Sequence, residues 1–168
     1  MWAAGAVSRC QLHSTLPAVD WVEESGDPLI RRHSMQRLKE LTIVTRNEPG
    51  RLARVLDTIA RRGVLILAIN SYPGFDLNTV RLVVSDTEAV RTLLNGLGFA
   101  VTTATVLGIR SIVKQGRLSK IIDALAQNGT NVDYLYGCAP TVGAETLVII
   151  HVSSVLASER ALKKAGFG

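Results

Sequence analysis

The chain has 168 residues, of which 47% are hydrophobic and 20% are charged, as in an ordinary globular protein with one large domain or two small ones. Its formal net charge is +5, but the basic residues are scattered along the chain and form no run. Without such a run or a nucleic-acid-binding motif, this charge does not indicate a protein that binds nucleic acid.

The cysteines and the longest apolar run exclude two further classes. Cys10 and Cys138 have neither the spacing of a zinc site nor that of a disulfide framework, so we expect a reducing, cytoplasmic compartment. The longest apolar run, Val64–Ile69, is far shorter than the roughly 18 residues that a membrane-spanning helix needs. It fits a buried strand, and we expect no membrane association.

Residues 1–37 show no sustained apolar period and form an unassigned N-terminal extension. Met35 is the only methionine after Met1 and lies just before the first predicted strand. Two alternatives follow from this position: translation starts at Met35, or the first residues form a tail without regular structure.

A βαββαβ unit is predicted over residues 38–105. Strands are expected where β-branched residues are enriched, as in Leu41–Thr45, and helices where apolar residues recur at helical spacing, as in Leu52–Ile59. Asp86 suits the start of the second helix as its N-terminal cap. The expected strands are residues 38–46, 64–69, 79–84 and 101–105, and the expected helices are residues 51–62 and 87–97.

The same pattern returns at an offset of 66 residues and predicts a second unit over residues 106–168. Gln115-Gly116-Arg117-Leu118 aligns with Pro49-Gly50-Arg51-Leu52, and the apolar positions of the following helix match as well. Matches at so many positions indicate an internal repeat. The second unit is incomplete, because it lacks its fourth strand.

The turn Asn47–Leu52 carries most of the functional information in the sequence. Pro49 has a fixed φ and needs no N–H, while Gly50 permits an unusual φ and exposes backbone N–H groups at a helix start. Such a turn can hold a carboxylate.

The duplicated βαββαβ unit, the Pro49-Gly50 turn, Gly63-Val64 and Gly98-Phe99 together resemble the ACT domain, a ferredoxin-like regulatory module that senses amino acids. The chain is similar over residues 38–168 to stand-alone tandem ACT proteins of bacteria, although Gln115 stands where proline is expected. The resemblance implies an α+β fold in which two units form an eight-stranded antiparallel sheet with helices on one face. It also implies that effectors bind between the units.

The family's serine-sensing members use two asparagines, one three residues before a turn glycine and one two residues after a pre-strand glycine. Those positions hold Asn47 in the first unit and Asn131 in the second, whereas the reciprocal positions hold Val113 and Leu65. The resemblance therefore implies one effector site. Its predicted ligand-binding residues are Asn47, Glu48, Pro49, Gly50, Arg51, Leu52, Asn131 and Val132.

An amide side chain beside free N–H groups suits a zwitterionic amino acid. The alternative is that Asn47 only caps the turn and Asn131 only begins a strand, which are both common uses of asparagine.

The sequence shows no catalytic, cofactor-binding or metal-binding constellation. Its serines lack a nucleophile elbow, and it has no phosphate-binding or dinucleotide-binding glycine motif. His151 has no second histidine nearby, which favours a structural or solvent-exposed role over metal ligation. Tyr134 and Tyr136 share one face of a strand, where they either wall the effector pocket or pack in a core or interface.

We therefore expect a regulatory protein that is not an enzyme, with a free amino acid as its effector and no cofactor. The alternative is a ligand-independent regulator that docks on an enzyme or a transcription factor, similar to tandem ACT repressors of glycine catabolism. The missing fourth strand supports this alternative, because an incomplete sheet leaves an edge open to a partner strand or to homo-oligomerisation.

Overall fold

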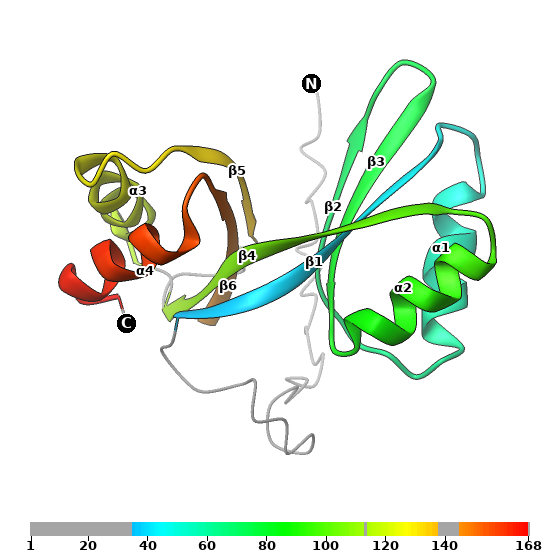
Figure 1. The fold of residues 1–168 in the computed structure, drawn as a ribbon, viewed down its shortest axis with the longest axis horizontal. Coiled ribbons are helices and arrows are strands. Elements are labelled where there is room, and N and C mark those ends of the chain that lie inside the picture. Colours follow the sequence, from blue (N-terminus) through cyan, green and yellow to red (C-terminus); the bar gives the residue numbers. More distant parts are fainter. Residues whose placement is uncertain (1–34, 113, 138–144, 168) are drawn as a thin grey trace, which may run out of the picture. The chain divides into compact units, whose positions relative to one another are not determined.

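The computed structural model describes residues 35–112, 114–137 and 145–167. The expectations for residues 1–34, Val113 and Cys138 lie outside this part of the chain. Within it, the order of elements confirms the predicted α+β fold with two ferredoxin-like units in tandem (Figure 1). The strands are β1 (Met35–Arg46), β2 (Ile66–Pro73), β3 (Leu77–Val84), β4 (Ala100–Ile112), β5 (Val132–Gly137) and β6 (Glu145–Val152). The helices are α1 (Arg51–Ala60), α2 (Thr87–Gly96), α3 (Arg117–Gln127) and α4 (Val155–Lys164).

The strands of the described residues form one antiparallel six-stranded sheet in the order β2-β3-β1-β4-β6-β5. β4 is a single strand, although the sequence predicts separate strands before and after residue 105. It pairs with β1 from Ala100 to Ile109 and with β6 from Leu107 to Ile112. The shared strand and the absence of a separate fourth strand in the second unit together explain why the sheet has six strands and not the eight that the resemblance implies.

The start of β1 fills the position of the fourth strand that the second unit lacks. Met35 pairs with Ile109 and Leu38 pairs with Val106, on the side of β4 opposite to β6. Arg37 of β1 also forms a bidentate ion pair with Glu159 of α4, in which both N–O distances are 2.6 Å. The prediction of an open edge at this position is therefore wrong, because β1 is long enough to serve both units.

The helices pack on one face of the sheet, as predicted, and make a separate core with each unit. Leu41 and Ile43 of β1 pack with residues of α1 and α2 in the first core. Leu107 and Ile109 of β4 pack with residues of α3 and α4 in the second core. These residues occupy alternate positions of paired strands, so their side chains lie on the same face of the sheet.

The sheet is curved, and its opposite face is concave. Residues on this concave face form a third core. Leu38 of β1, Val83 of β3 and Ile149 of β6 are buried together there. Tyr134 of the edge strand β5 also reaches Glu40 of β1, although β6 and β4 lie between these strands. Three strand spacings in a flat sheet would separate them by about 14 Å, so the contact requires strong curvature.

β2 is an edge strand, and the prediction that its apolar run forms a buried strand is wrong. Among the described strands it pairs only with β3. Leu65 is 48% exposed, Ile69 is 44% exposed and Tyr72 is 65% exposed. An apolar run fits either a central strand or an edge strand that is left open, so the sequence could not separate the two.

Candidate functional site

The predicted effector turn connects β1 to α1 and leaves the start of that helix without a side-chain cap. Gly50 has a left-handed backbone conformation with φ at 85°, and no acidic residue lies in the first turn of α1. The Asn47 N–H donates to the Asp76 carbonyl at 3.0 Å, and the Arg51 N–H donates to the Glu48 carbonyl at 3.3 Å. The first N–H groups of a helix have no intrahelical partner, so this turn can offer donors to an anion.

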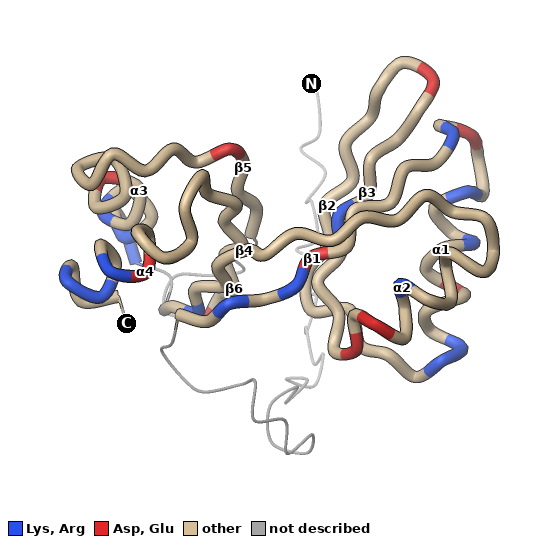
Figure 2. Tube along the Cα trace, in the orientation of Figure 1, with Lys and Arg blue, Asp and Glu red and all other residues tan. Residues whose placement is uncertain are grey.

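A pocket of about 250 Å³ adjoins the turn, and three arginines line it: Arg46, Arg51 and Arg54. Glu48 accepts a hydrogen bond from Arg51 Nε at 3.0 Å and lies 3.5 Å from Arg46. The hydrogen bond from Arg51 holds the pKa of the Glu48 carboxyl below its ordinary value. Figure 2 shows basic segments on both sides of one acidic segment at this turn. The remaining lining is largely apolar: Val44, Thr45, Leu77, Leu97, Gly98 and Phe99.

Two predicted site residues of the first unit have other surroundings. Leu52 is partly buried and packs against the core beneath α1 and α2. Pro49 is exposed beside Gly50. The Leu52 side chain therefore belongs to the core, whereas the backbone of the turn remains available to a ligand.

Asn131 precedes β5 and is tied to its own unit. Its side-chain N–H donates to the Asp133 carboxylate at 2.9 Å. Its backbone N–H donates to the Ser153 hydroxyl at 3.2 Å, and the Ser153 N–H donates to its carbonyl at 3.0 Å. Val132, the next residue, packs against the second core. Asn131 is exposed, and its side-chain carbonyl accepts no hydrogen bond from the residues that the structure describes.

The two predicted halves of the site lie on different sides of β4 within the chain. Asn47 follows the end of β1, and Asn131 lies beside Ser153, which follows the end of β6. These two strands flank β4. No hydrogen bond among the described residues joins the two asparagines, so each half has separate partners.

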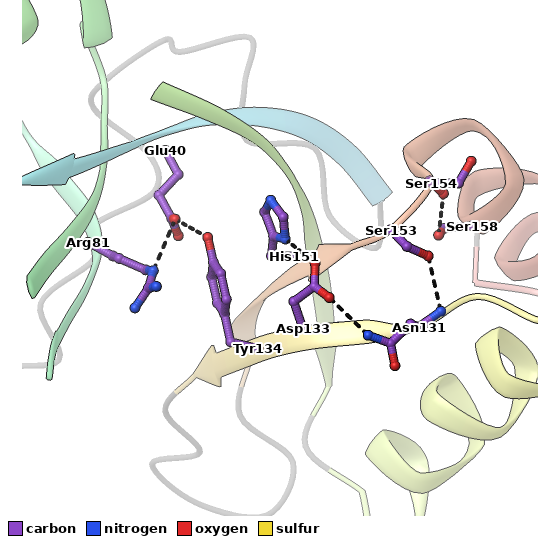
Figure 3. A network of polar contacts seen from close by, with 9 residues as sticks. All are labelled: Glu40, Arg81, Asn131, Asp133, Tyr134, His151, Ser153, Ser154 and Ser158. Carbon is purple, nitrogen blue, oxygen red and sulfur yellow. Dashed lines mark hydrogen bonds and ion pairs between the residues drawn. The ribbon is translucent and has the colours of Figure 1, made fainter. Parts of the chain in front are cut away.

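A buried polar cluster joins the two units on the concave face of the sheet (Figure 3). Glu40 of β1 is 0% exposed. It accepts hydrogen bonds from the Tyr134 hydroxyl at 2.5 Å and the Tyr136 hydroxyl at 2.8 Å. Arg81 of β3 lies 3.7 Å from the same carboxylate, and its guanidinium carbon stands 4.0 Å from the centre of the Tyr134 ring. The tyrosines therefore pack in an interface between the units. Tyr136 also lines a pocket with Leu67 and Leu147, so a role in walling a pocket stays a prediction for this residue.

The electrostatics of this cluster keep both tyrosines protonated. Burial raises the pKa of Tyr134 and of Tyr136 above the ordinary value, and the hydrogen bonds to Glu40 raise it further. A phenolate beside a buried carboxylate would place two negative charges together at low dielectric. Glu40 is therefore held by neutral donors and one cation, and the cluster is suited to holding the units together.

His151 of β6 links this cluster to Asn131. Its ring stacks on Tyr134, with ring centres 4.8 Å apart. Its Nδ1 atom lies 2.8 Å from the Asp133 carboxylate that also accepts from Asn131 (Figure 3). These contacts give His151 a structural role, which is one of the two roles that its isolated position in the sequence favours.

The sequence prediction missed Glu40, Arg81, Arg46 and Arg54. Glu40 stands two residues after Leu38 on one strand face, which places a carboxylate at a core position. That mismatch was a signal for a buried polar cluster, because a buried charge requires partners. Arg46 and Arg54 gave no signal, since only the folded turn brings them to one pocket.

Two classes of site are not represented in the part of the chain that the structure describes. It contains no group of three or more His, Cys, Asp or Glu side chains placed to hold a metal ion. None of its helices is both long enough and apolar enough to cross a bilayer.

Known families and structures agree with this fold. The family model of the ACT domain pair matches residues 36–162, whereas a search of curated proteins found no match. Protein BT0572 from Bacteroides thetaiotaomicron superposes with a TM-score of 0.73 at 26% identity, over 79% of this chain and 90% of that chain. Regulatory subunits of aspartate kinase from Thermus thermophilus, in the ligand-free form, and from Thermus flavus share the fold.

The Thermus thermophilus structure has a TM-score of 0.58 at 19% identity and covers 79% of this chain and 95% of its own. The Thermus flavus structure has a TM-score of 0.53 at 20% identity and covers 79% of this chain and 97% of its own. The family match extends across both repeats, from the start of β1 to α4. The chain therefore belongs to the family of ACT domain pairs.

Proposed function

We propose that this ACT pair binds a free amino acid, catalyses no reaction on it and transmits its occupancy to a protein partner in the cytoplasm. The observation that carries the proposal is the uncapped helix start at Gly50, which opens beside a pocket with arginine side chains. Free N–H groups and a helix N-terminus favour a carboxylate, and Glu48 offers an acceptor for an ammonium group. Membership of the ACT family supports a regulatory role.

We also propose that Asn47 and Asn131 meet in one site between two copies of the chain. In a single copy the two residues have separate hydrogen-bond partners on different sides of β4. The exposed apolar residues of β2 supply a surface on which copies can associate. A ligand that bridges two copies favours one arrangement of them, and that preference is what allows binding to transmit a signal.

Calorimetric titration with a panel of amino acids tests the proposal. We expect binding by at least one of them, weakened roughly threefold to tenfold by Asn47→Ala and by Asn131→Ala, because each variant loses one side-chain hydrogen bond. Asn95→Ala, an exposed asparagine of α2, is the matched control and should bind as the unaltered protein does. Absence of binding by every amino acid at millimolar concentration would overturn the proposal.

Mixing the two variants tests the arrangement between copies. If each site takes Asn47 from one copy and Asn131 from another, a mixture of Asn47→Ala and Asn131→Ala proteins regains some unaltered sites in the mixed assemblies. If both residues act within one chain, the mixture binds as weakly as either variant alone. Light scattering on the same samples should show an assembly larger than one chain.

One observation favours a second candidate, a ligand-independent regulator that docks on an enzyme or a transcription factor. The edge strand β2 and the hairpin after it expose Ile69, Tyr72 and Phe75, the last of which is 101% exposed. Such an edge can accept a strand of a partner. Ile69→Lys with Tyr72→Lys would abolish partner binding in this case, whereas Asn47→Ala would leave it intact.

A further inference from the structure

The pocket beside the first turn holds more positive charge than a neutral effector requires. Arg46, Arg51 and Arg54 line it, and Glu48 is the carboxylate that pairs with two of them. Three positive charges against one negative charge leave an excess of two. The positive end of the α1 dipole adds to this excess, since the first turn of α1 contains no acidic residue.

Arg54 contributes a cation that none of the described residues neutralises. It stands one helical turn after Arg51 on α1 and is exposed. In the described part of the chain it has no ion pair, whereas Arg61 at the other end of α1 pairs with Asp57 at 2.9 Å. A guanidinium that faces a pocket without a carboxylate partner is suited to an anionic group of a ligand.

The second repeat does not reproduce this arrangement. At the offset of 66 residues, Arg46 and Glu48 correspond to Ile112 and Lys114. The guanidinium of Arg117, the counterpart of Arg51, lies 5.3 Å from the centre of the Phe167 ring. Lys120 stands at the position of Arg54, so the second turn is also basic but has no carboxylate at the position of Glu48. A carboxylate paired with arginines is thus particular to the first turn.

We propose that the effector of this pocket is a dicarboxylic amino acid of the size of aspartate or glutamate. This inference rests on the proposed function and specifies its ligand class. The α-carboxylate binds the N–H groups at the start of α1, and Glu48 accepts from the α-ammonium group. The side-chain carboxylate pairs with Arg54 and Arg46, and the ligand methylene groups contact Leu97 and Phe99.

Calorimetry with two matched pairs of ligands tests this proposal: aspartate against asparagine, and glutamate against glutamine. Each pair differs in charge and hardly in shape. We expect at least one of the acidic ligands to bind about tenfold more tightly than its amide, since a charge-assisted pair is lost in the amide. Arg54→Gln should remove this difference, and Arg61→Gln, which removes the same charge from the other end of α1, should preserve it.

The outcomes separate this inference from the proposed function. Equal binding of acids and amides would overturn the dicarboxylate proposal and leave an amino-acid effector in place. A preference for acids that persists in Arg54→Gln would overturn the assignment to this pocket. Absence of binding by all four ligands and by every other amino acid would overturn both proposals.

Discussion

Glu40 and Glu48 belong to the same short stretch of chain and both meet arginine, yet their surroundings differ. Glu40 is fully buried on β1. Its carboxylate accepts hydrogen bonds from two tyrosine hydroxyls and forms an ion pair with Arg81. Glu48 lies on an exposed turn, where Arg46 and Arg51 share it and Arg54 stands nearby without a carboxylate partner among the described residues.

The difference follows from the cost of burying charge. A carboxylate away from water must have all its partners supplied by the protein, because an unpaired buried charge is strongly destabilising. A carboxylate on an exposed turn is screened by water, so an imbalance of charge beside it costs little. The polar groups of the Glu40 cluster therefore bind one another and stabilise the contact between the units, whereas the exposed turn at Glu48 is available to a ligand.

The largest effect is expected from the loss of the Glu40 carboxylate. Glu40→Ala should lower the free energy of unfolding by about 3–5 kcal/mol, because Arg81 and two tyrosine hydroxyls lose their buried partner. Glu40→Gln should lower it less, since the amide oxygen still accepts a hydrogen bond. Urea unfolding followed by circular dichroism measures both.

Glu48→Ala is the matched control for the buried carboxylate. It also removes a carboxylate that pairs with arginine, but from an exposed position, so the unfolding midpoint should remain almost unchanged. Equal destabilisation by Glu40→Ala and Glu48→Ala would show that burial does not distinguish the two positions.

A second prediction concerns pH, with an intermediate effect. Burial and Glu40 raise the pKa of Tyr134 and of Tyr136, so both stay protonated in the folded protein at a pH where the unfolded chain has lost these protons. Stability from a raised pKa is present below the unfolded pKa of about 10 and is lost as pH rises above it. The free energy of unfolding is expected to fall by at most about 1.4 kcal/mol per pH unit for each tyrosine. The actual fall should be smaller, because solvent partly reaches both rings.

Urea unfolding between about pH 9 and pH 12, a range centred above the ordinary tyrosine pKa, measures this loss. The variant with Tyr134→Phe and Tyr136→Phe should be less stable at pH 9 and should lose less stability on the way to pH 12. Tyr72→Phe, at a 65% exposed tyrosine, should keep the slope of the unaltered protein. Parallel slopes in all three proteins would contradict the protonated, buried state of the pair.

Much of the fold was predictable because the sequence contains the same pattern of strands and helices twice. The strand and helix patterns that begin at Leu41 recur from Leu107 onward, so a weak assignment in one unit gains support from the other. The shared strand β4 was not predictable from this repetition, since residues 101–105 and 106–110 each read as a complete short strand. Pairing along the full length of β1 is a long-range property, and local patterns do not encode the register.

The candidate site was predictable only where backbone conformation decides it. Gly50 adopts the left-handed conformation that a glycine between a strand and a helix permits. The partners of Glu40 come from β3 and β5, which are remote in the sequence, and the arginines of the pocket come from both sides of the turn. Such juxtapositions depend on the curvature of the sheet and on the packing of α1, which residue spacing does not specify.

The smallest expected effect concerns the exposed carboxylate of Glu48 and tests whether it contacts the ligand, in contrast to the buried carboxylate of Glu40. If Glu48 accepts the α-ammonium group of the effector, Glu48→Gln should weaken the binding of aspartate by a small factor, because an exposed ion pair contributes little. It should not weaken the binding of succinate, which carries both carboxylates but no ammonium group. Calorimetric titration with the two ligands measures this difference, and the urea midpoint of the variant should match that of the unaltered protein. A similar loss for both ligands would show that Glu48 acts by positioning Arg51 and Arg46, with which it pairs at 3.0 Å and 3.5 Å, and does not contact the ligand.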